Sequence, residues 1–396
     1  MTLPQKIFLA VLSFYVVFDF TLGSLVGLYL WETTKEASRI ISYYIFLFLS
    51  ILITTQLTSR LINRYGAKKV YITSILLGLI QAFVLMTVGS SIGNVIIPFG
   101  ILAGTSIGLQ AMSYSVIVSF VTSNKDTTKF LGIKSSLMNV VSIISVPVIT
   151  SLISLFGSYQ ISYLISLFAG ITIILLISKI SIPPSSEHTT SLGYRSLMQI
   201  DEVRIFTVTR LLYGIYNGPM WAILGIVTYI FIGDVVRWGY ISTSLTILSI
   251  IGAYLYSRIS SSSIRNALSV LTTFLFASIA LLLAANWSFV LFMLYQIVVV
   301  LLNSSFSLHY EGVIYSLVND NEVIKNNMNK VLAIGEIAMG LGRTIPLVLL
   351  LIVGFTFDNP TYLQILFILI SVIPMLILNK LSSIIPHSSR YATIYS

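Results

Sequence analysis

The sequence predicts an all-α membrane protein with twelve transmembrane helices arranged in two six-helix bundles. Of the 396 residues, 56% are apolar and only 9% are charged, whereas soluble domains carry roughly 25% charged residues. Apolar runs recur from residue 7 to residue 385, and many are long enough to cross a bilayer as a helix. The loops between them alternate in basic content, as the positive-inside rule describes.

The first half of the chain contains six of these apolar runs. We place spans at 7–30, 40–62, 70–89, 93–121, 130–156 and 159–178. Barrel strands would be about ten residues long and would alternate between lipid-facing and inward-facing residues. Segments such as "VIVSFV" show no such alternation. We therefore predict helices, and we expect the first to be retained as a span, because a signal peptide would be followed by a soluble body.

A polar stretch at 181–203 separates the halves, and six more runs follow it. These are 204–231, 235–257, 265–284, 287–317, 327–356 and 361–381. The predicted organisation is a bundle at 1–180, a cytoplasmic linker at 181–203, a second bundle at 204–385 and a polar tail at 386–396.

The distribution of lysine and arginine predicts that both termini are cytoplasmic. Of the 22 basic residues, Lys35, Arg39 and Arg237 fall in loops on the opposite side, and Arg210 and Arg343 fall within spans. All others fall in the loops, the tails and the span ends that this orientation places inside, which is the arrangement that the positive-inside rule favours. The net charge of +9 is thereby explained by topology, and we expect no nucleic-acid partner.

The two halves resemble each other at an offset of about 199 residues. This offset places Pro147 on Pro346 and brings Asp19 beside Asn217. A parallel internal repeat of six spans predicts two bundles about a pseudo-two-fold axis normal to the membrane.

The loop "SRLINRYGAKK" at 59–69 carries a resemblance to the major facilitator superfamily. The family pattern is Gly, three residues, Asp, Arg, any residue, Gly and then basic residues. This chain matches it at Arg64, Gly66, Lys68 and Lys69, and has Ser59 and Asn63 in place of the Gly and the Asp. The resemblance covers essentially the whole chain and implies a transporter. The loop's cations either latch a cytoplasmic gate or anchor the loop inside.

Two features separate this chain from the superfamily's drug antiporters. Their usual arginine is missing from span 4, and span 5 offers only Pro147 where they have a Gly-Pro signature. Span 4 instead has Gly100, Gly104 and Gly108 on one helical face, a spacing that we interpret as close helix packing.

Ionisable residues within spans are costly, so each is a functional candidate. Asp19 lies near the middle of span 1, which the resemblance implies is cavity-lining, and burial of a carboxylate favours reversible protonation. We predict that Asp19 carries a coupling proton or contacts the solute; the alternative is a structural acid. In "GEIAMGLGRTIP", Glu336 and Arg343 are seven residues apart, about 10 Å along a helix and on the same face. Arg343 is predicted to hold an anionic solute group or to pair with Asp19.

Further polar candidates fall at similar depths. His309 and Glu311 in span 10 come close to the depth of Glu336 and Arg210. One interpretation is a cytoplasmic-side network of these four residues. The alternative is that Glu311 pairs with arginines at the cytoplasmic rim and that His309 is structural. In "YGIYNGPMW", Gly214, Gly218 and Pro219 are expected to interrupt span 7. The aromatic and amide candidates for solute binding there and on the other implied cavity-lining spans are Tyr213, Tyr216, Asn217, Trp221, Asn139 and Gln110. The alternative for span 7 is a kink with aromatics in the core.

Catalytic and metal-binding motifs are missing from the sequence. There is no cysteine, no H-E-x-x-H, no P-loop and no nucleophile elbow, so we expect no enzyme, cofactor or metal site. The sequence predicts a monomeric, proton-coupled secondary transporter of the plasma membrane. Its expected partners are a small solute, a proton or other coupling ion, and the lipid bilayer. An uncoupled facilitator and a non-transporting sensor or assembly protein are the alternatives.

Overall fold

The computed structural model is helical throughout the two compact units that it describes. It describes residues 2–121, 127–182, 193–259, 262–320, 323–324 and 327–382, without the side chains of 307–320 and a few others. The first unit comprises Met1–His188 and Trp221–Thr243, and the second comprises Thr189–Met220 and Ser244–Ser396. The bundle boundaries inferred from the sequence stay a prediction.

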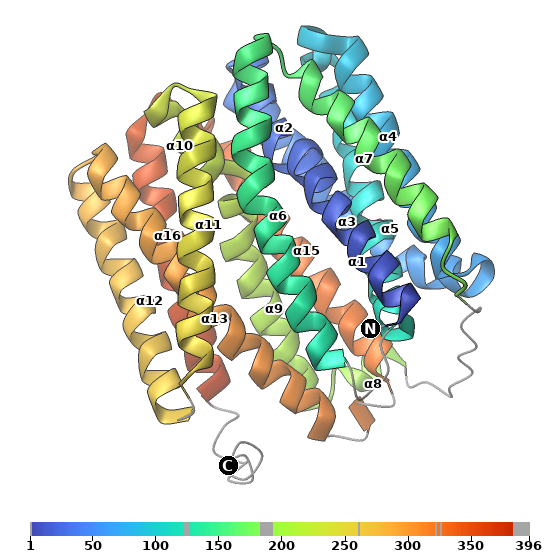
Figure 1. Ribbon diagram of the computed structural model, residues 1–396. Coiled ribbons are helices and arrows are strands. Elements are labelled where there is room, and N and C mark those ends of the chain that lie inside the picture. The colour runs from blue at the N-terminus through green and yellow to red at the C-terminus, as the bar shows by residue number, and fades with distance from the viewer. Residues whose placement is uncertain are drawn as a thin grey trace. The chain divides into compact units, whose positions relative to one another are not determined.

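Helices of the first half begin at the N-terminus and follow one another with short connections (Figure 1). They are α1 (Leu3–Asp19), a π-helical turn η1 (Phe20–Ser24), α2 (Leu25–Thr34), α3 (Ala37–Tyr65), α4 (Ala67–Val88), a 3₁₀ segment η2 (Gly89–Val95), α5 (Ile96–Val121), α6 (Thr127–Phe156) and α7 (Gln160–Ser178). Because α1, η1 and α2 are continuous, they form one span.

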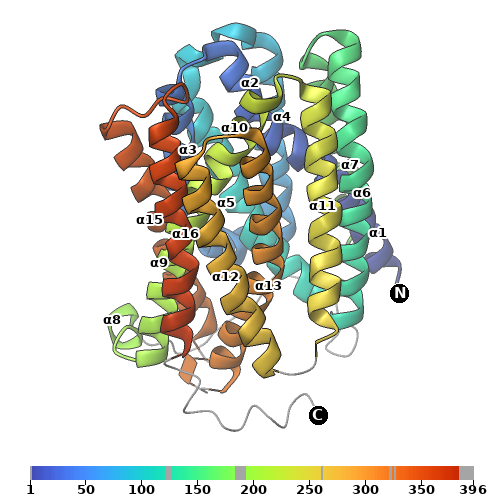
Figure 2. The same cartoon turned by 90° about the vertical axis from the view of Figure 1, so that its left-hand side faces the viewer.

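Helices of the second half repeat this order, preceded by a short helix in the linker. They are α8 (Tyr194–Leu197), α9 (Asp201–Pro219), a second π-helical turn η3 (Met220–Leu224), α10 (Gly225–Ile232), α11 (Val235–Ser257), α12 (Ser262–Ala285), α13 (Phe289–Asp320), α15 (Met328–Ile352) and α16 (Pro360–Ser382). Figure 2 shows α12, α13 and α16 side by side, and α12 contacts both of the others.

Eleven helices in the described part of the chain are long and apolar enough to cross a membrane. They coincide with eleven of the twelve predicted spans. The tenth predicted span, 287–317, corresponds to α13, whose apolar part Phe289–Asn303 is shorter. An all-helical membrane protein is thus confirmed, while the count of twelve stays a prediction.

Glycine spacing in span 4 produces the close helix packing that the sequence predicts. A Cβ added at Gly100 would lie 2.7 Å from the carbonyl oxygen of Tyr43 in α3. At Gly104 the corresponding distance is 2.2 Å to the carbonyl of Leu47, and Gly108 would meet Thr54 at 2.9 Å. Only a residue without Cβ lets the backbones of α5 and α3 approach so closely, so this interpretation is confirmed.

The glycines of span 7 do not interrupt the helix, contrary to the expectation from the sequence. Helix α9 runs without a break through Gly214 and Gly218 to Pro219. Both glycines face α15, where an added Cβ at Gly214 would lie 2.3 Å from the Met339 carbonyl oxygen. Their role is close packing of α9 on α15. The irregularity begins one residue later, at η3.

Spans 1 and 7 carry the same irregularity at matching positions. The π-helical turn follows Asp19 in span 1 and Pro219 in span 7, and each span is 32 residues long. A π-helical turn within an α-helix often marks a functional position. The repeat inferred from the sequence is therefore visible in the backbone of these two spans.

Candidate functional site

Asp19 ends α1 in the middle of the first span, immediately before η1. Its side chain is exposed, and its Oδ1 accepts a hydrogen bond of 3.2 Å from the Tyr15 hydroxyl one turn earlier. A carboxylate directed at hydrocarbon from mid-span would be costly. An exposed, hydrogen-bonded Asp19 therefore suits a polar, water-accessible path.

A chain of polar side chains leads away from Asp19 within the first unit. Tyr71 of α4 is fully buried and interacts electrostatically with Asp19, Gln110 and Tyr114. The Lys134 ammonium lies 4.8 Å from the centre of the Tyr114 ring. The structure thus brings the predicted candidates Asp19 and Gln110 into one neighbourhood.

Sequence reasoning missed the tyrosines of this group. Tyr15 had a signal, since residues four apart in a helix lie on the same face and can interact. Tyr71 had none, because its place beside Asp19 depends on how α4 packs. Asn139 lies half-buried on α6.

In the second unit, Arg343 stands at the centre of the predicted polar residues. Its guanidinium interacts electrostatically with Glu336 on the same helix and with Tyr213 and Arg210 on α9. Helices α9 and α15 can place these side chains together because their backbones are in close contact at Gly218. A Cβ added at Gly218 would lie only 2.6 Å from the carbonyl oxygen of Arg343. The same-face prediction for Glu336 and Arg343 agrees with this arrangement.

Arg210 is held against α15 as well as against its own helix. Its guanidinium lies 5.4 Å from the centre of the Phe206 ring, and Nη1 is 3.8 Å from the sulfur of Met339. The remaining members of the predicted network, His309 and Glu311, fall in α13 where side chains lie outside the described residues.

The aromatic candidates of span 7 divide between core and surface. Tyr216 is buried and donates a hydrogen bond of 3.0 Å to Oδ1 of Asn303, and its ring meets Phe276 edge-on. This favours the packing alternative for Tyr216. Trp221 is 52% exposed and stacks on Phe48 of α3, while Asn217 is half-buried. Trp221 and Asn217 thus keep accessible surface.

One basic residue of the loop motif at 59–69, Lys68, forms specific hydrogen bonds at the end of another helix. Gly66 adopts φ 85°, which a glycine tolerates best, between α3 and α4. The following Lys68 Nζ donates to the carbonyl oxygens of Ser178 and Ile180 at 2.6 and 2.8 Å. It therefore caps the C-terminus of α7. Arg64 lies over the neighbouring Tyr65 ring at 5.2 Å.

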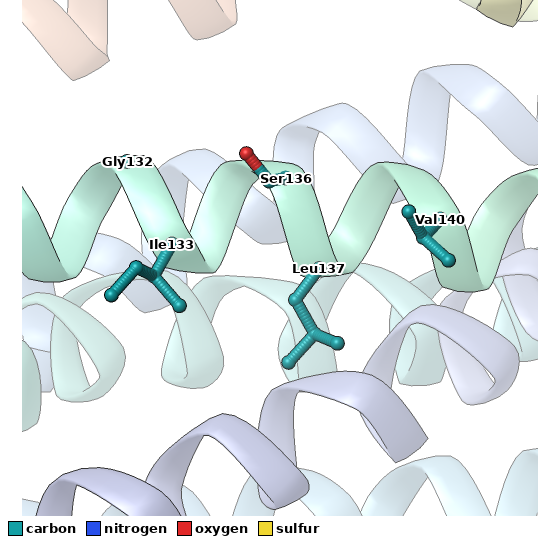
Figure 3. Close-up of a pocket in the computed structure, with 5 residues that line it drawn as sticks. All are labelled: Gly132, Ile133, Ser136, Leu137 and Val140. Carbon is teal, nitrogen blue, oxygen red and sulfur yellow. The ribbon is translucent and has the colours of Figure 1, made fainter.

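A hollow of about 550 Å³ along one face of α6 offers no comparable chemistry. Its lining comes from that single helix and consists of Gly132, Ile133, Ser136, Leu137 and Val140 (Figure 3). Such a surface has one hydroxyl and no ionisable group. The polar groups around Asp19 and Arg343 are stronger candidates for solute and ion chemistry.

Comparison with known proteins identifies the class to which this fold and these intramembrane groups belong. A family model described as Major Facilitator Superfamily matches residues 7–345. The chain belongs to this superfamily of membrane transporters. The resemblance inferred from the loop motif is confirmed.

Solved structures show the same fold. A variant of the nucleoside transporter NupG aligns with a TM-score of 0.72 at 14% identity, over 96% of this chain and 99% of that one. A D-xylose-proton symporter aligns with a TM-score of 0.66 at 11% identity, over 93% of this chain and 96% of that one. A comparison with curated protein sequences finds no match.

Proposed function

We propose that this chain is a secondary active transporter that moves a small solute across the plasma membrane by alternating access, coupled to protons. In this proposal it has twelve spans, cytoplasmic termini and no catalytic activity. It acts as a monomer, and the energy for uphill movement comes from a proton gradient.

The observation that carries the proposal is the state of Asp19. It is a carboxylate at mid-span, exposed, directly before a π-helical turn, and hydrogen-bonded by Tyr15. A group that must take up and release a proton needs access to water and a neighbour that holds it in place. Arg343 and Glu336 supply a second polar group, in span 11, that can respond to the solute.

For the solute we propose a neutral compound rich in hydroxyl groups, of the sugar or nucleoside class. The support is the pair of similar structures, which are described as a nucleoside transporter and a D-xylose-proton symporter. Hydroxyl groups suit the acceptors and donors of Asp19 and Gln110, and Trp221, which is exposed in the same unit, offers a stacking face. These side chains are the proposed binding residues.

The first test is solute-dependent proton movement in proteoliposomes that contain a pH-sensitive dye. Pentoses, hexoses and nucleosides are added to the native protein, to Asp19→Asn, and to Asp358→Asn. Asp358 is exposed in the turn between α15 and α16, so it controls for the loss of one carboxylate. We expect flux with one of these solutes in the native and Asp358→Asn proteins, and none in Asp19→Asn.

Counterflow of radiolabelled solute separates the alternatives. Exchange does not require net proton movement, and the Asn amide still hydrogen-bonds solute hydroxyl groups. Asp19→Asn is therefore expected to retain exchange. Exchange without proton flux in the native protein would instead show an uncoupled facilitator. Saturable binding with neither exchange nor flux would show a sensor.

A further inference from the structure

A second carboxylate of span 1, outside the proposed site, joins two distant parts of the chain. The Tyr229 hydroxyl in α10 donates a hydrogen bond to Oε1 of Glu32 in α2, across 197 residues of sequence. Glu32 lies near the end of the span that is remote from the N-terminus, and it is half-buried. Hydrogen bonds to a charged acceptor are stronger than neutral ones.

Three tyrosines cluster near Glu32. The Tyr29 ring lies 5.4 Å from the Tyr159 ring and 5.7 Å from the Tyr163 ring, measured between centres. The Tyr159 phenol also interacts electrostatically with Glu32.

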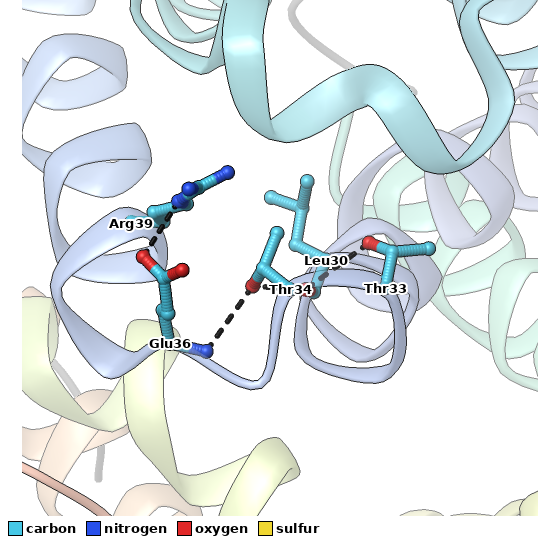
Figure 4. A network of polar contacts seen from close by, with 5 residues as sticks. All are labelled: Leu30, Thr33, Thr34, Glu36 and Arg39. Atoms are coloured by element: carbon cyan, nitrogen blue, oxygen red, sulfur yellow. Dashed lines mark hydrogen bonds and ion pairs between the residues drawn. The ribbon is translucent and has the colours of Figure 1, made fainter.

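Basic groups near this corner have other partners. Arg39 pairs with Glu36 at 2.6 Å (Figure 4), and the Lys35 ammonium lies 5.4 Å from the centre of the Trp31 ring. Among the residues that the structure describes, the hydroxyl of Tyr229 donates a hydrogen bond to the Glu32 carboxylate.

Tyr229 belongs to the segment Trp221–Thr243, which is part of the first unit although the residues before and after it belong to the second. The unit boundary falls between Met220 and Trp221, within the π-helical turn η3, and Trp221–Thr243 belongs to the first unit. The segment has a second point of approach to α2, at Ile226. A Cβ added at Gly27 of α2 would lie 3.8 Å from the Ile226 side chain. Trp238 stacks on Phe20 of η1 with 6.4 Å between ring centres.

We propose that Glu32 and Tyr229 are positioning residues that latch Trp221–Thr243 to the first unit. Breaking their hydrogen bond is the step that opens the solute path at this end of the spans, with η3 as the hinge. The role of this latch in opening a solute path rests on the proposed transport function, but the attachment of the segment by Glu32 and Tyr229 does not. The end concerned is the outer one in the predicted orientation.

The lack of cysteine in the native chain allows a direct test with a single reporter. Ile226→Cys places a thiol at a position that is 2% exposed and faces α2. Its reaction with a membrane-impermeant maleimide added outside intact cells reports detachment of α10. The rate is measured alone and combined with Tyr229→Phe, with Glu32→Gln, with both, and with Tyr29→Phe.

We expect Tyr229→Phe to raise the outside labelling rate roughly tenfold, in line with the loss of a hydrogen bond to a charged group. Glu32→Gln is expected to raise it less, because the amide still accepts a hydrogen bond. Once Phe occupies 229, adding Glu32→Gln should cause little further change. Tyr29→Phe, which removes a hydroxyl from the same helix without touching Tyr229, should leave the rate unchanged.

Three results would overturn the latch. One is an unchanged rate in Tyr229→Phe; another is an equal rise in Tyr29→Phe, which would indicate general loosening; the third is additive effects of Glu32→Gln and Tyr229→Phe. Labelling needs no solute, so these results are independent of the transport assay. A matching unfolding midpoint in detergent confirms that a change in labelling is a change in conformation.

Discussion

At the residue scale, glycine decides how closely the second unit's helices pack. Gly342 of α15 faces α9, and an added Cβ there would lie 2.2 Å from the Leu211 carbonyl oxygen. Gly132 of α6 is a matched contrast, because nothing lies within 4 Å of its added Cβ. The same chemical change should therefore have opposite consequences at the two positions.

We expect Gly342→Ala to destabilise the protein by about 1–3 kcal/mol, the usual cost of forcing extra volume into a packed contact. Gly132→Ala should be neutral or stabilising by about 0.5–1 kcal/mol, because Ala favours the helix. Unfolding midpoints in detergent measure both. Similar midpoints for the two variants would show that α9 and α15 are not in backbone contact.

The same scale shows what the sequence could and could not predict of the site. Asp19 was identifiable because a carboxylate in an apolar span is rare. The burial of Tyr216 was not, since its direction follows from the contact with Asn303 on another span. Glu32 escaped notice because it lies near the end of its span, where a charge needs no special cause.

At the element scale, the loop motif works through a helix end. Lys68 satisfies the carbonyl oxygens of Ser178 and Ile180 at the C-terminus of α7, where a cation also complements the helix dipole. Lys69 is the natural control, because it is exposed and its loss changes the net charge equally.

We expect Lys68→Met to weaken the last turn of α7 by about 0.5 kcal/mol, a value reduced by the partial exposure of the contact. Amide hydrogen exchange in that turn should then become faster than in the native protein, while Lys69→Met should leave it unchanged. Equal effects of the two substitutions would indicate that the loop acts only through its total charge.

Sequence patterns located the helices well and their irregularities poorly. The runs 235–257 and 360–380 were close to their predicted limits because hydropathy and length alone define a span. The π-helical turn of span 1 follows an aspartate and has no such signal. The π-helical turn of span 7 directly follows Pro219, a residue type that disturbs helices and that the sequence analysis named. The glycines of span 7 misled because their packing partner is remote in sequence.

At the scale of the whole molecule, topology depends on whether α13 crosses the membrane. In the part of the chain that the structure describes, eleven other helices qualify by length and composition. With α13 included, the count is even and both termini lie on one side. Without it, the count is odd and the C-terminal end of α16 lies opposite the N-terminus. The predicted excess of internal lysine and arginine requires the even count.

Single cysteines in the cysteine-free chain decide between the two topologies. Leu3→Cys, Lys69→Cys, Arg237→Cys and Lys380→Cys all replace exposed residues. With an impermeant maleimide on intact cells, we expect labelling at Arg237→Cys alone, and labelling of the other three only after permeabilisation. Lys380→Cys is decisive, because α13 lies between it and Arg237. If it reacts from outside while Lys69→Cys does not, α13 does not cross, the positive-inside assignment fails for the second half, and alternating access through twelve spans loses its structural basis.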